Sequence, residues 1–243
     1  MHQRPRRASS RSQPCRPLGY VVRNVASLVD APRIKRHSFR TLSAEEARAL
    51  LRAAEGDRFE ALYVVALTTG MRQGELLGLQ WKSVDLKRQT LAVRGSLERG
   101  VKTLTIGEPK TRTSRRQVHL TPAAVEALRQ HRVRQHEERL AVGSAWEDNE
   151  LVFCSEIGTP VSASNLLNRS FRRLLERAGI EPIRFHDLRH TAATLLLEQG
   201  MHPKIVSEML GHSTIAITLD LYSHVTSAMH KQAADAMEEI LRS

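Results

Sequence analysis

The stretch FHDLRHTAATLLLEQG, residues 185–200, places a cluster of charged and imidazole side chains directly before an apolar segment. Its second half has Ala192, Leu195 and Leu196 at helical spacing. It ends at Gly200, a residue that tolerates the left-handed conformation of a helix end. This pattern predicts an amphipathic helix, and the polar cluster lies on its first turn.

The first turn of a helix has unpaired N–H groups and the positive end of the helix dipole, so it attracts anions. His186 and Arg189 are three residues apart and share one face, so both can reach one phosphate-sized group. Two alternatives stay open. His186, Asp187 and His190 are similar to the H-E-x-x-H zinc pattern, with the shorter aspartate in place of glutamate. The polar side chains could also simply cap the helix and face water.

Helical patterns continue on both sides of this stretch. Ser43 and Glu46 form a capping box before a helix that runs to about Glu55. The apolar segment FEALYVVALTTG predicts a second helix that ends near Gly70, and GELLGLQW predicts a third. Thr121 supplies an N-cap, with a proline after it, for a long fourth helix. The fourth and later helices are predicted over residues 122–142, 164–178, 187–199, 203–210, 213–222 and 227–242.

Residues 83–120 have a different pattern, in which Thr, Val and Leu alternate with polar residues between turn-like segments. This alternation predicts a small antiparallel sheet of about three strands. The apolar run LVFCS, residues 151–155, predicts one more strand. The expected fold is therefore mainly α-helical with a small antiparallel β-sheet, in the α+β class.

Composition divides the chain into three parts. Residues 1–17 are rich in Arg, Ser and Pro and lack apolar periodicity, so we expect a disordered basic tail. Residues 18–40 contain one short apolar patch followed by a linker-like segment. Residues 41–243 carry the regular patterns and enough apolar residues for one large core.

Charge and cysteine content narrow the class of protein. The 243 residues carry a formal net charge of +11, which favours nucleic acid or another polyanion as a partner. The two cysteines, Cys15 and Cys154, are too few and too far apart for a disulfide framework or a cysteine zinc site. No apolar run approaches the ~20 residues that cross a bilayer. We therefore expect a soluble protein of the cytoplasm that associates with the nucleoid and not with a membrane.

Arg72 lies between two apolar segments, VVALTTG and LLGLQW. A charged group in such surroundings is either paired or directed at a ligand. Glu75, three residues later, is the expected pairing partner, so a structural ion pair is the simplest interpretation of Arg72 alone.

A basic segment, GEPKTRTSRRQVHL, lies between two of the predicted strands. It contains Lys110, Arg112, Arg115 and Arg116. These cations could form a solvated hairpin tip, or the tip could lie along a nucleic-acid groove and contact phosphates. Such a tip could also bring Lys110 to a reacting centre as a proton donor.

Two further candidates lie near the C-terminal end of the patterned region. Gly211 and His212 form a tight turn between two predicted helices, which is also typical of a helix-turn-helix DNA reader. Among the three tyrosines, Tyr20 lies in the N-terminal segment and Tyr63 lies in an apolar helix that predicts burial. Tyr222 ends a helix among polar residues and is therefore placed like a reactive hydroxyl.

Taken in order, TGMRQGELLGL, PKTRTSRR, HDLRH, LGH and a tyrosine ten residues after that last histidine resemble the tyrosine recombinase family, of the phage integrase type. The order and spacing match over about residues 41–226. The resemblance implies two phosphate-binding arginines, a hairpin lysine, paired histidines and a nucleophilic tyrosine, namely Arg72 and Arg189, Lys110, His186 and His212, and Tyr222. It also implies that residues 41–243 are a catalytic domain and that residues 18–40 are a remnant of a core-binding domain with a linker.

Such a site suits attack on a phosphodiester. A tyrosine has a pKa near 10, so forming its anion at pH 7 costs about 4 kcal/mol, which neighbouring cations reduce. The planar guanidinium groups of two arginines can each donate two hydrogen bonds to the nonbridging oxygens. Lys110 could protonate the departing 5′-oxygen, and His186 could accept the tyrosine proton. The 3′-phosphotyrosine product preserves a phosphoester, so the resemblance implies no cofactor and no metal.

The resemblance implies double-stranded DNA as the partner, a homo-tetramer on that DNA and accessory DNA-bending proteins. Arg112, Arg115 and Arg116 are the expected DNA-binding residues of the hairpin. Most of the preceding core-binding domain and the arm-binding region are missing from this sequence, so we expect a truncated recombinase or integrase. Three other hypotheses remain: a non-catalytic DNA-binding remnant, a metal-dependent hydrolase that uses the HDLRH motif, and a type IB topoisomerase.

Overall fold

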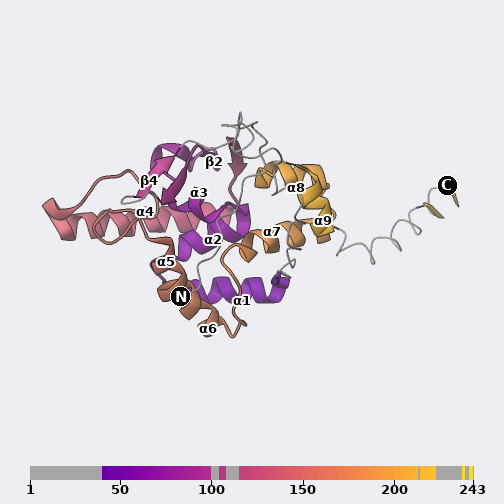
Figure 1. Cartoon of the computed structure of the whole chain (residues 1–243), viewed down its shortest axis with the longest axis horizontal. Helices are drawn as coiled ribbons and strands as arrows, with labels where there is room; N and C mark the ends of the chain where they lie inside the picture. The colour runs from indigo at the N-terminus through magenta and orange to yellow at the C-terminus, as the bar shows by residue number, and fades with distance from the viewer. Residues whose placement is uncertain are drawn as a thin grey trace, which may run out of the picture. The chain divides into compact units, whose positions relative to one another are not determined.

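Helices form most of the structure, with two small antiparallel sheets beside them (Figure 1). The computed structural model describes residues 40–99, 104–107, 115–212, 214–222, 237–238 and 241–242. The helical elements are α1 (Ala44–Ala54), α2 (Glu60–Thr69), α3 (Gln73–Leu77), η2 (Trp81–Ser83), α4 (Pro122–Val142), η4 (Gly143–Ala145), α5 (Ala163–Asn165), η5 (Leu166–Phe171), α6 (Arg172–Ala178), α7 (Asp187–Glu198), α8 (Pro203–Leu210) and α9 (Ala216–Tyr222). The strands are β1 (Val84–Asp85), β2 (Thr90–Val93), β3 (Ser96–Arg99), β4 (Leu104–Gly107) and β5 (Arg116–His119).

Capping residues set the helix ends that the sequence predicted most accurately. The Ser43 hydroxyl accepts the Glu46 N–H at 3.2 Å, and the Glu46 carboxylate accepts the Ser43 N–H at 3.0 Å, so the capping box at the start of α1 is confirmed. Gly70 follows α2 in the left-handed region, with φ of 60°. Thr121 caps α4, which begins at Pro122 as predicted.

Helix α2 lies at the centre of the core. It contacts α1, α4 and α7, and Figure 1 shows it between them. Because α2 is apolar on all sides, burial is the arrangement that suits it. Tyr63 in α2 is fully buried, its hydroxyl lies 2.6 Å from the Ser170 hydroxyl, and burial raises the pKa of its phenol well above the usual value. The predicted core role of Tyr63 is therefore confirmed.

The described strands form two sheets rather than the single sheet that was predicted. Strands β1, β2 and β5 form one antiparallel sheet in the order β1-β2-β5, and β3 and β4 form a separate antiparallel pair. The reason is that β3 packs against α3. A Cβ atom added to Gly78, directly after α3, would lie 2.8 Å from the Leu97 nitrogen of β3. That close approach leaves no room for a side chain at this position.

The predicted strand over residues 151–155 is wrong. This buried segment makes only the isolated bridges Gln80 with Leu151 and Cys154 with Pro160. Its carbonyl groups accept hydrogen bonds from side chains of α4 instead of from a neighbouring strand. An apolar run alone does not distinguish these two ways of satisfying buried backbone groups.

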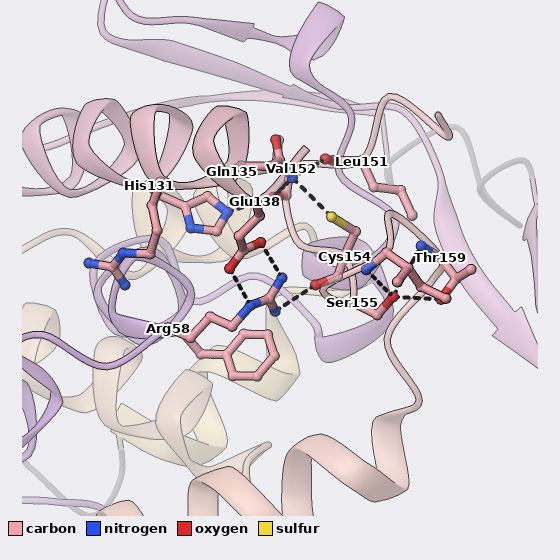
Figure 2. A network of polar contacts seen from close by, with 12 residues as sticks. Arg58, His131, Gln135, Glu138, Leu151, Val152, Cys154, Ser155 and Thr159 are labelled. Carbon is pink, nitrogen blue, oxygen red and sulfur yellow. Dashed lines mark hydrogen bonds and ion pairs between the residues drawn. The ribbon is translucent and has the colours of Figure 1, made fainter. Parts of the chain in front are cut away.

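Side chains of α4 hold this segment in place (Figure 2). The Gln135 amide donates to the carbonyls of Leu151 at 3.0 Å and Val152 at 3.1 Å, and to the Cys154 sulfur at 3.0 Å. The imidazole of His131 lies 2.7 Å from the Val152 carbonyl, and burial lowers the pKa of this histidine. The ring is therefore neutral at pH 7 and can donate through this nitrogen.

Arg58 connects α4 to the same segment. Its Nε and Nη2 each donate to the Glu138 carboxylate at 2.7 Å, and its Nη1 donates to the Cys154 carbonyl at 2.8 Å (Figure 2). Each side chain of this pair is 21% exposed. Such a mostly buried, two-pronged pair is costly to break from one side only.

We expect Glu138→Ala to destabilise the fold by about 1 to 3 kcal/mol, because Arg58 would keep a desolvated charge without its carboxylate. Thermal unfolding measures this as a fall in melting temperature of about 2 to 4 °C per kcal/mol for a domain of this size. Glu137→Ala is the matched control, since Glu137 is the exposed neighbour on the same helix. Equal melting temperatures of the two variants would contradict a stabilising role for the pair.

Other helix boundaries differ from the predictions in detail. Helix α3 ends at Leu77, before Gly78, and a short 3-10 turn begins only at Trp81, the last residue of GELLGLQW. The predicted helix over 164–178 is one helical run with a π-helical middle, η5. The predicted helix over 213–222 begins only at Ala216. The predicted tail over 1–17 lies outside the described residues, as does the predicted remnant and linker over 18–40 except residue 40, and most of the predicted C-terminal helix over 227–242.

The core consists of two clusters of unequal size. A large cluster fills the space around α2, and a small one contains Ala193 and Leu197 of α7 with Val206 and Leu210 of α8. Helix α7 therefore packs on both clusters. No helix in the described ranges combines the length and the apolar character that a bilayer crossing requires.

Candidate active site

Arg72 is held at the turn between α2 and α3. Its Nη1 donates to Glu75 Oε1 at 2.8 Å, its Nη2 donates to the Gly211 carbonyl at 2.9 Å, and its backbone N–H donates to Glu75 Oε2 at 3.0 Å. The predicted ion pair with Glu75 is thus present. The Arg72 side chain is still 39% exposed, so it can also reach a ligand from solvent.

Arg189 of α7 points into the same region and is only 3% exposed. Its Nη1 donates to the Gly70 carbonyl at 2.7 Å, while its Nη2 is buried and has no hydrogen-bond partner among the described residues. Burial first, and then the charge of Arg72, lower the pKa of Arg189 to about 9. A buried cation with an unused donor is costly by itself, so this arrangement favours a bound anion.

His212 lies beside both arginines, directly after α8. Gly211 ends α8 with φ of 68°, and this left-handed turn directs the chain toward α9. The His212 Nδ1 lies 2.8 Å from the hydroxyl of Thr218, a buried residue of α9. Burial, followed by the charges of Arg189 and Arg72, lowers the pKa of His212 to about 4. The ring is therefore neutral at pH 7.

His186 and His190 form an edge-to-face pair at the start of α7, with ring centroids 5.0 Å apart. His186 is exposed overall, yet partial desolvation and then the charge of Arg189 lower its pKa. Burial, followed by repulsion from His186 when that ring is protonated, lowers the pKa of His190 to about 4. The predicted cluster thus comes together at the first turn of α7, and its histidines are neutral beside the two arginines.

Comparison with known proteins places this arrangement in a family. The sequence model of the phage integrase family matches residues 40–229, which is well over half of the chain. The chain belongs to the phage integrase family. The resemblance to this family that the sequence motifs indicated is therefore confirmed.

Two curated relatives show how far the likeness to full-length proteins extends. A tyrosine recombinase XerC-like protein of Caldanaerobacter subterraneus subsp. tengcongensis is 38% identical over 216 residues, covering 82% of this chain and 54% of the relative. An integrase of Streptomyces ambofaciens is 37% identical over 235 residues, covering 91% of this chain and 59% of the relative. This integrase-family chain thus spans somewhat more than half the length of these relatives.

Two solved structures share the fold of this integrase-family chain. XerA recombinase has 28% sequence identity and a TM-score of 0.62, with 85% of this chain and 66% of that chain covered. The Tn1549 transposon integrase in complex with transposon right end DNA has 24% identity and a TM-score of 0.70, covering 91% and 71%. Because its sequence identity is below 25%, the likeness to the Tn1549 integrase shows a shared fold and nothing more. The predicted α+β class with a small antiparallel sheet is confirmed.

Three of the predicted positions of this integrase-family chain lie wholly or partly outside the described residues. Lys110 and Arg112 lie wholly outside them. The backbone of Tyr222 ends α9, and its side chain is not described. Arg115 is exposed at the start of the described segment that contains β5, so a DNA-binding role for it stays a prediction.

The side chain of Arg116, an expected DNA-binding residue, lies inside the protein, so its DNA-binding role stays a prediction. Its side chain is 7% exposed and donates to the Glu75 carboxylate at 2.9 Å and 3.2 Å and to the Met209 carbonyl at 2.6 Å. The buried carboxylate of Glu75 draws this guanidinium into the protein. The sequence placed Arg116 among basic neighbours but gave no sign that a distant acidic residue would bind it.

The metal-binding interpretation of the HDLRH motif lacks a ligand set in the part of the chain that the structure describes. There, no three side chains of His, Cys, Asp or Glu lie together as a metal site. The Asp187 carboxylate is 4% exposed and accepts the backbone N–H of Arg184 at 2.9 Å and its Nη2 at 2.9 Å. Asp187 therefore fixes the turn before α7.

Sequence reasoning missed three groups that shape the site. The carbonyls of Gly70 and Gly211 each accept a guanidinium, and the Thr218 hydroxyl lies within hydrogen-bond distance of His212. The glycines could have been suspected from their places at helix ends, next to the motif residues. Thr218 gave no signal, because its contact depends on how α9 packs.

The low pKa of His190 predicts acid sensitivity. The pKa of about 4 in the folded state lies below the ordinary value near 6.5, so the unfolded chain binds more protons between these values. The contribution of His190 to the free energy of unfolding is therefore highest above pH 6.5, where its ring is neutral in both states, and falls as pH decreases toward 4. Because the ring is half-buried, we expect about 1 kcal/mol between pH 7 and pH 5.

Melting temperatures of a His190→Gln variant at pH 7 and pH 5 measure this contribution. We expect the variant to lose less stability on acidification than the native chain. His136→Gln, an exposed histidine on α4, is the matched control and should behave like the native chain. The same acid-induced loss in the His190 variant and the native chain would refute the assignment.

Proposed function

We propose that this chain cleaves and rejoins strands of double-stranded DNA as a tyrosine recombinase, through a 3′-phosphotyrosine intermediate. The observation that supports it most is the buried Arg189, with one donor on the Gly70 carbonyl and a second donor unused. Arg72 lies close enough to lower its pKa. A phosphodiester group would satisfy the unused donor and neutralise this charge.

In the proposed reaction, Arg72 and Arg189 hold the two nonbridging oxygens of the scissile phosphate. The Tyr222 oxygen forms a bond to phosphorus while the bond from phosphorus to the 5′-oxygen breaks. Negative charge grows on the oxygens that the guanidinium groups bind. Each well-placed donor lowers such a barrier by about 3 to 4 kcal/mol. The Gly70 carbonyl holds Arg189 in position before DNA arrives, so its orientation costs little during the reaction.

Proton transfers fit the charge state of the histidines. His186 is neutral at pH 7 and can accept the proton of the Tyr222 phenol. Lys110 donates a proton to the departing 5′-oxygen. His212, held at its Nδ1 by Thr218, hydrogen-bonds a nonbridging oxygen through its other nitrogen. Attack by a second 5′-hydroxyl on the phosphotyrosine reverses these steps and rejoins the strands, so the scheme needs no nucleotide cofactor.

The partners follow from the same proposal. Double-stranded DNA binds over Arg72 and Arg189, with Arg112 and Arg115 on its backbone phosphates. The Tn1549 transposon integrase, which shares this fold, was solved in complex with transposon right end DNA, and a DNA substrate for this chain agrees with that. A homo-tetramer on DNA, with accessory bending proteins at the nucleoid, would complete strand exchange.

Covalent trapping tests the proposal on DNA of many sequences at once. The native chain is mixed with a pool of nicked suicide duplexes with randomised cores, whose short downstream fragment, with its free 5′-hydroxyl, diffuses away after cleavage. Adducts that survive SDS are isolated, their DNA is sequenced, and the modified peptide is identified by mass spectrometry. We expect an adduct at residue 222 with an enriched core sequence.

Three results would count against this function. An adduct at another residue would refute the assigned nucleophile. Salt-sensitive DNA binding without any adduct would instead support a non-catalytic DNA-binding protein. Relaxation of supercoiled DNA without an enriched core would point to topoisomerase-like chemistry.

A further inference from the structure

Arg116 and Glu75 form a buried charge pair beneath the proposed phosphate site. Both Glu75 oxygens accept Arg116, at 2.9 Å and 3.2 Å, and the same oxygens accept the Arg72 side chain and backbone at 2.8 Å and 3.0 Å. The Glu75 side chain is 5% exposed. One carboxylate thus connects Arg72 of the site to Arg116 of β5.

The same guanidinium also holds the end of α8. Arg116 Nε donates to the Met209 carbonyl at 2.6 Å, two residues before the Gly211 carbonyl that accepts Arg72. The guanidinium packs directly on Gly211, since an added Cβ there would lie 2.9 Å from Arg116 Nη1. His212 follows immediately. Arg116 therefore contacts the supports of both Arg72 and His212.

We propose that Arg116 is a positioning residue, which fixes Arg72 through Glu75 and fixes His212 through the end of α8, so that both converge on one DNA phosphate. This inference rests on the proposed function of the site. It assigns Arg116 a role inside the protein, where Arg116 shares the Glu75 carboxylate with Arg72, and not a direct contact with DNA.

The geometry requires arginine rather than any cation. The planar fork donates to both Glu75 oxygens while Nε donates to Met209, which is three acceptors in one fixed arrangement. A lysine would keep the charge but could not hold these acceptors in that arrangement. Charge and geometry can therefore be separated by substitution.

The experiment compares Arg116→Lys and Arg116→Met with the native chain and with Arg94→Met. Arg94 is the matched control because it is exposed just after β2, the strand that pairs with β5. Three quantities are measured for each: the melting temperature, the DNA affinity between low and high salt, and the rate of covalent trapping at saturating DNA on the enriched duplex.

We expect Arg116→Lys to slow trapping by about 100-fold, the scale of a misplacement near 1 Å, while DNA affinity stays within about twofold. Arg116→Met should also trap slowly and keep the native salt dependence of binding. Arg94→Met should trap at the native rate. Native trapping by Arg116→Lys would overturn the proposal. So would an Arg116→Met variant that traps normally at saturation but loses about one unit of salt slope, because that marks a phosphate contact.

Glu75→Gln approaches the same pair from the other side and provides a second variant if either Arg116 variant is unfolded. The double variant Arg116→Lys with Glu75→Gln should be no slower than the slower single variant, because both changes disrupt one unit. Additive losses would overturn the coupling through Glu75.

A readout independent of catalysis separates this inference from the proposed function. If the native chain forms no adduct, the proposed function fails. The positioning role is then judged by the imidazole nitrogen signals of His212 in NMR spectra. Altered His212 signals in Arg116→Lys, with native signals in Arg94→Met, would support it. Native signals in both variants would refute it.

Discussion

Tyr222→Phe is expected to abolish covalent trapping of nicked DNA, because the substitution removes the oxygen that would bond to phosphorus and keeps the ring. DNA affinity should stay within about twofold, since a neutral hydroxyl contributes no counterion release. The measurement is SDS-resistant adduct formed by the variant on the duplex that the native chain prefers. An adduct formed by the variant would remove Tyr222 from the mechanism.

Tyr63→Phe is the control for that result. It also deletes one tyrosine oxygen, but this oxygen is buried beside Ser170 in the core. We expect normal trapping with a loss of stability of about 1 kcal/mol, the usual contribution of one buried hydrogen bond. If both variants failed to trap DNA, the loss would reflect the fold and not the nucleophile.

Arg189→Lys is expected to slow trapping by about 10²- to 10³-fold at saturating DNA, equivalent to about 3 to 4 kcal/mol. Arg189 uses one end of its fork on the Gly70 carbonyl and keeps the other for an anion. A lysine ammonium cannot hold both in the same plane. Arg173→Lys, on the exposed face of α6, is the matched control and should trap at the native rate.

Anion binding gives a second measurement for Arg189 that needs no DNA target. We expect sulfate to raise the melting temperature of the native chain more than that of Arg189→Lys, because only the native guanidinium offers the buried donor. The general stabilising effect of sulfate acts on both proteins and cancels in the comparison. Equal shifts would show that the donor does not bind a free anion.

Local rules predicted the helices well because their ends depend on neighbouring residues. The box of Ser43 with Glu46, the cap at Thr121 and the glycine after α2 are all decided within a few positions. The strand over 151–155 failed for the opposite reason. Whether its carbonyls would meet another strand or the Gln135 amide was decided by how α4 packs.

The same distinction applies to the site. The structure places Arg72, Arg189, His186 and His212 near one another, as the motif spacing led us to expect. Arg116 was assigned to DNA because its neighbours are basic, while its actual partner lies 41 positions earlier in the sequence. Lys110 and Tyr222 stay predictions that the proposed trapping experiments address.

The division of the core into two clusters affects the local stability of α8, the helix that directly precedes His212. Helix α8 is anchored by a cluster of few apolar residues, whereas α2 is surrounded by the large cluster. Amide hydrogens of α8 should therefore exchange with solvent through a local opening that leaves α2 protected, so two separate exchange regimes are expected. Such an opening would also break the hydrogen bonds that guanidinium groups donate to the Met209 and Gly211 carbonyls.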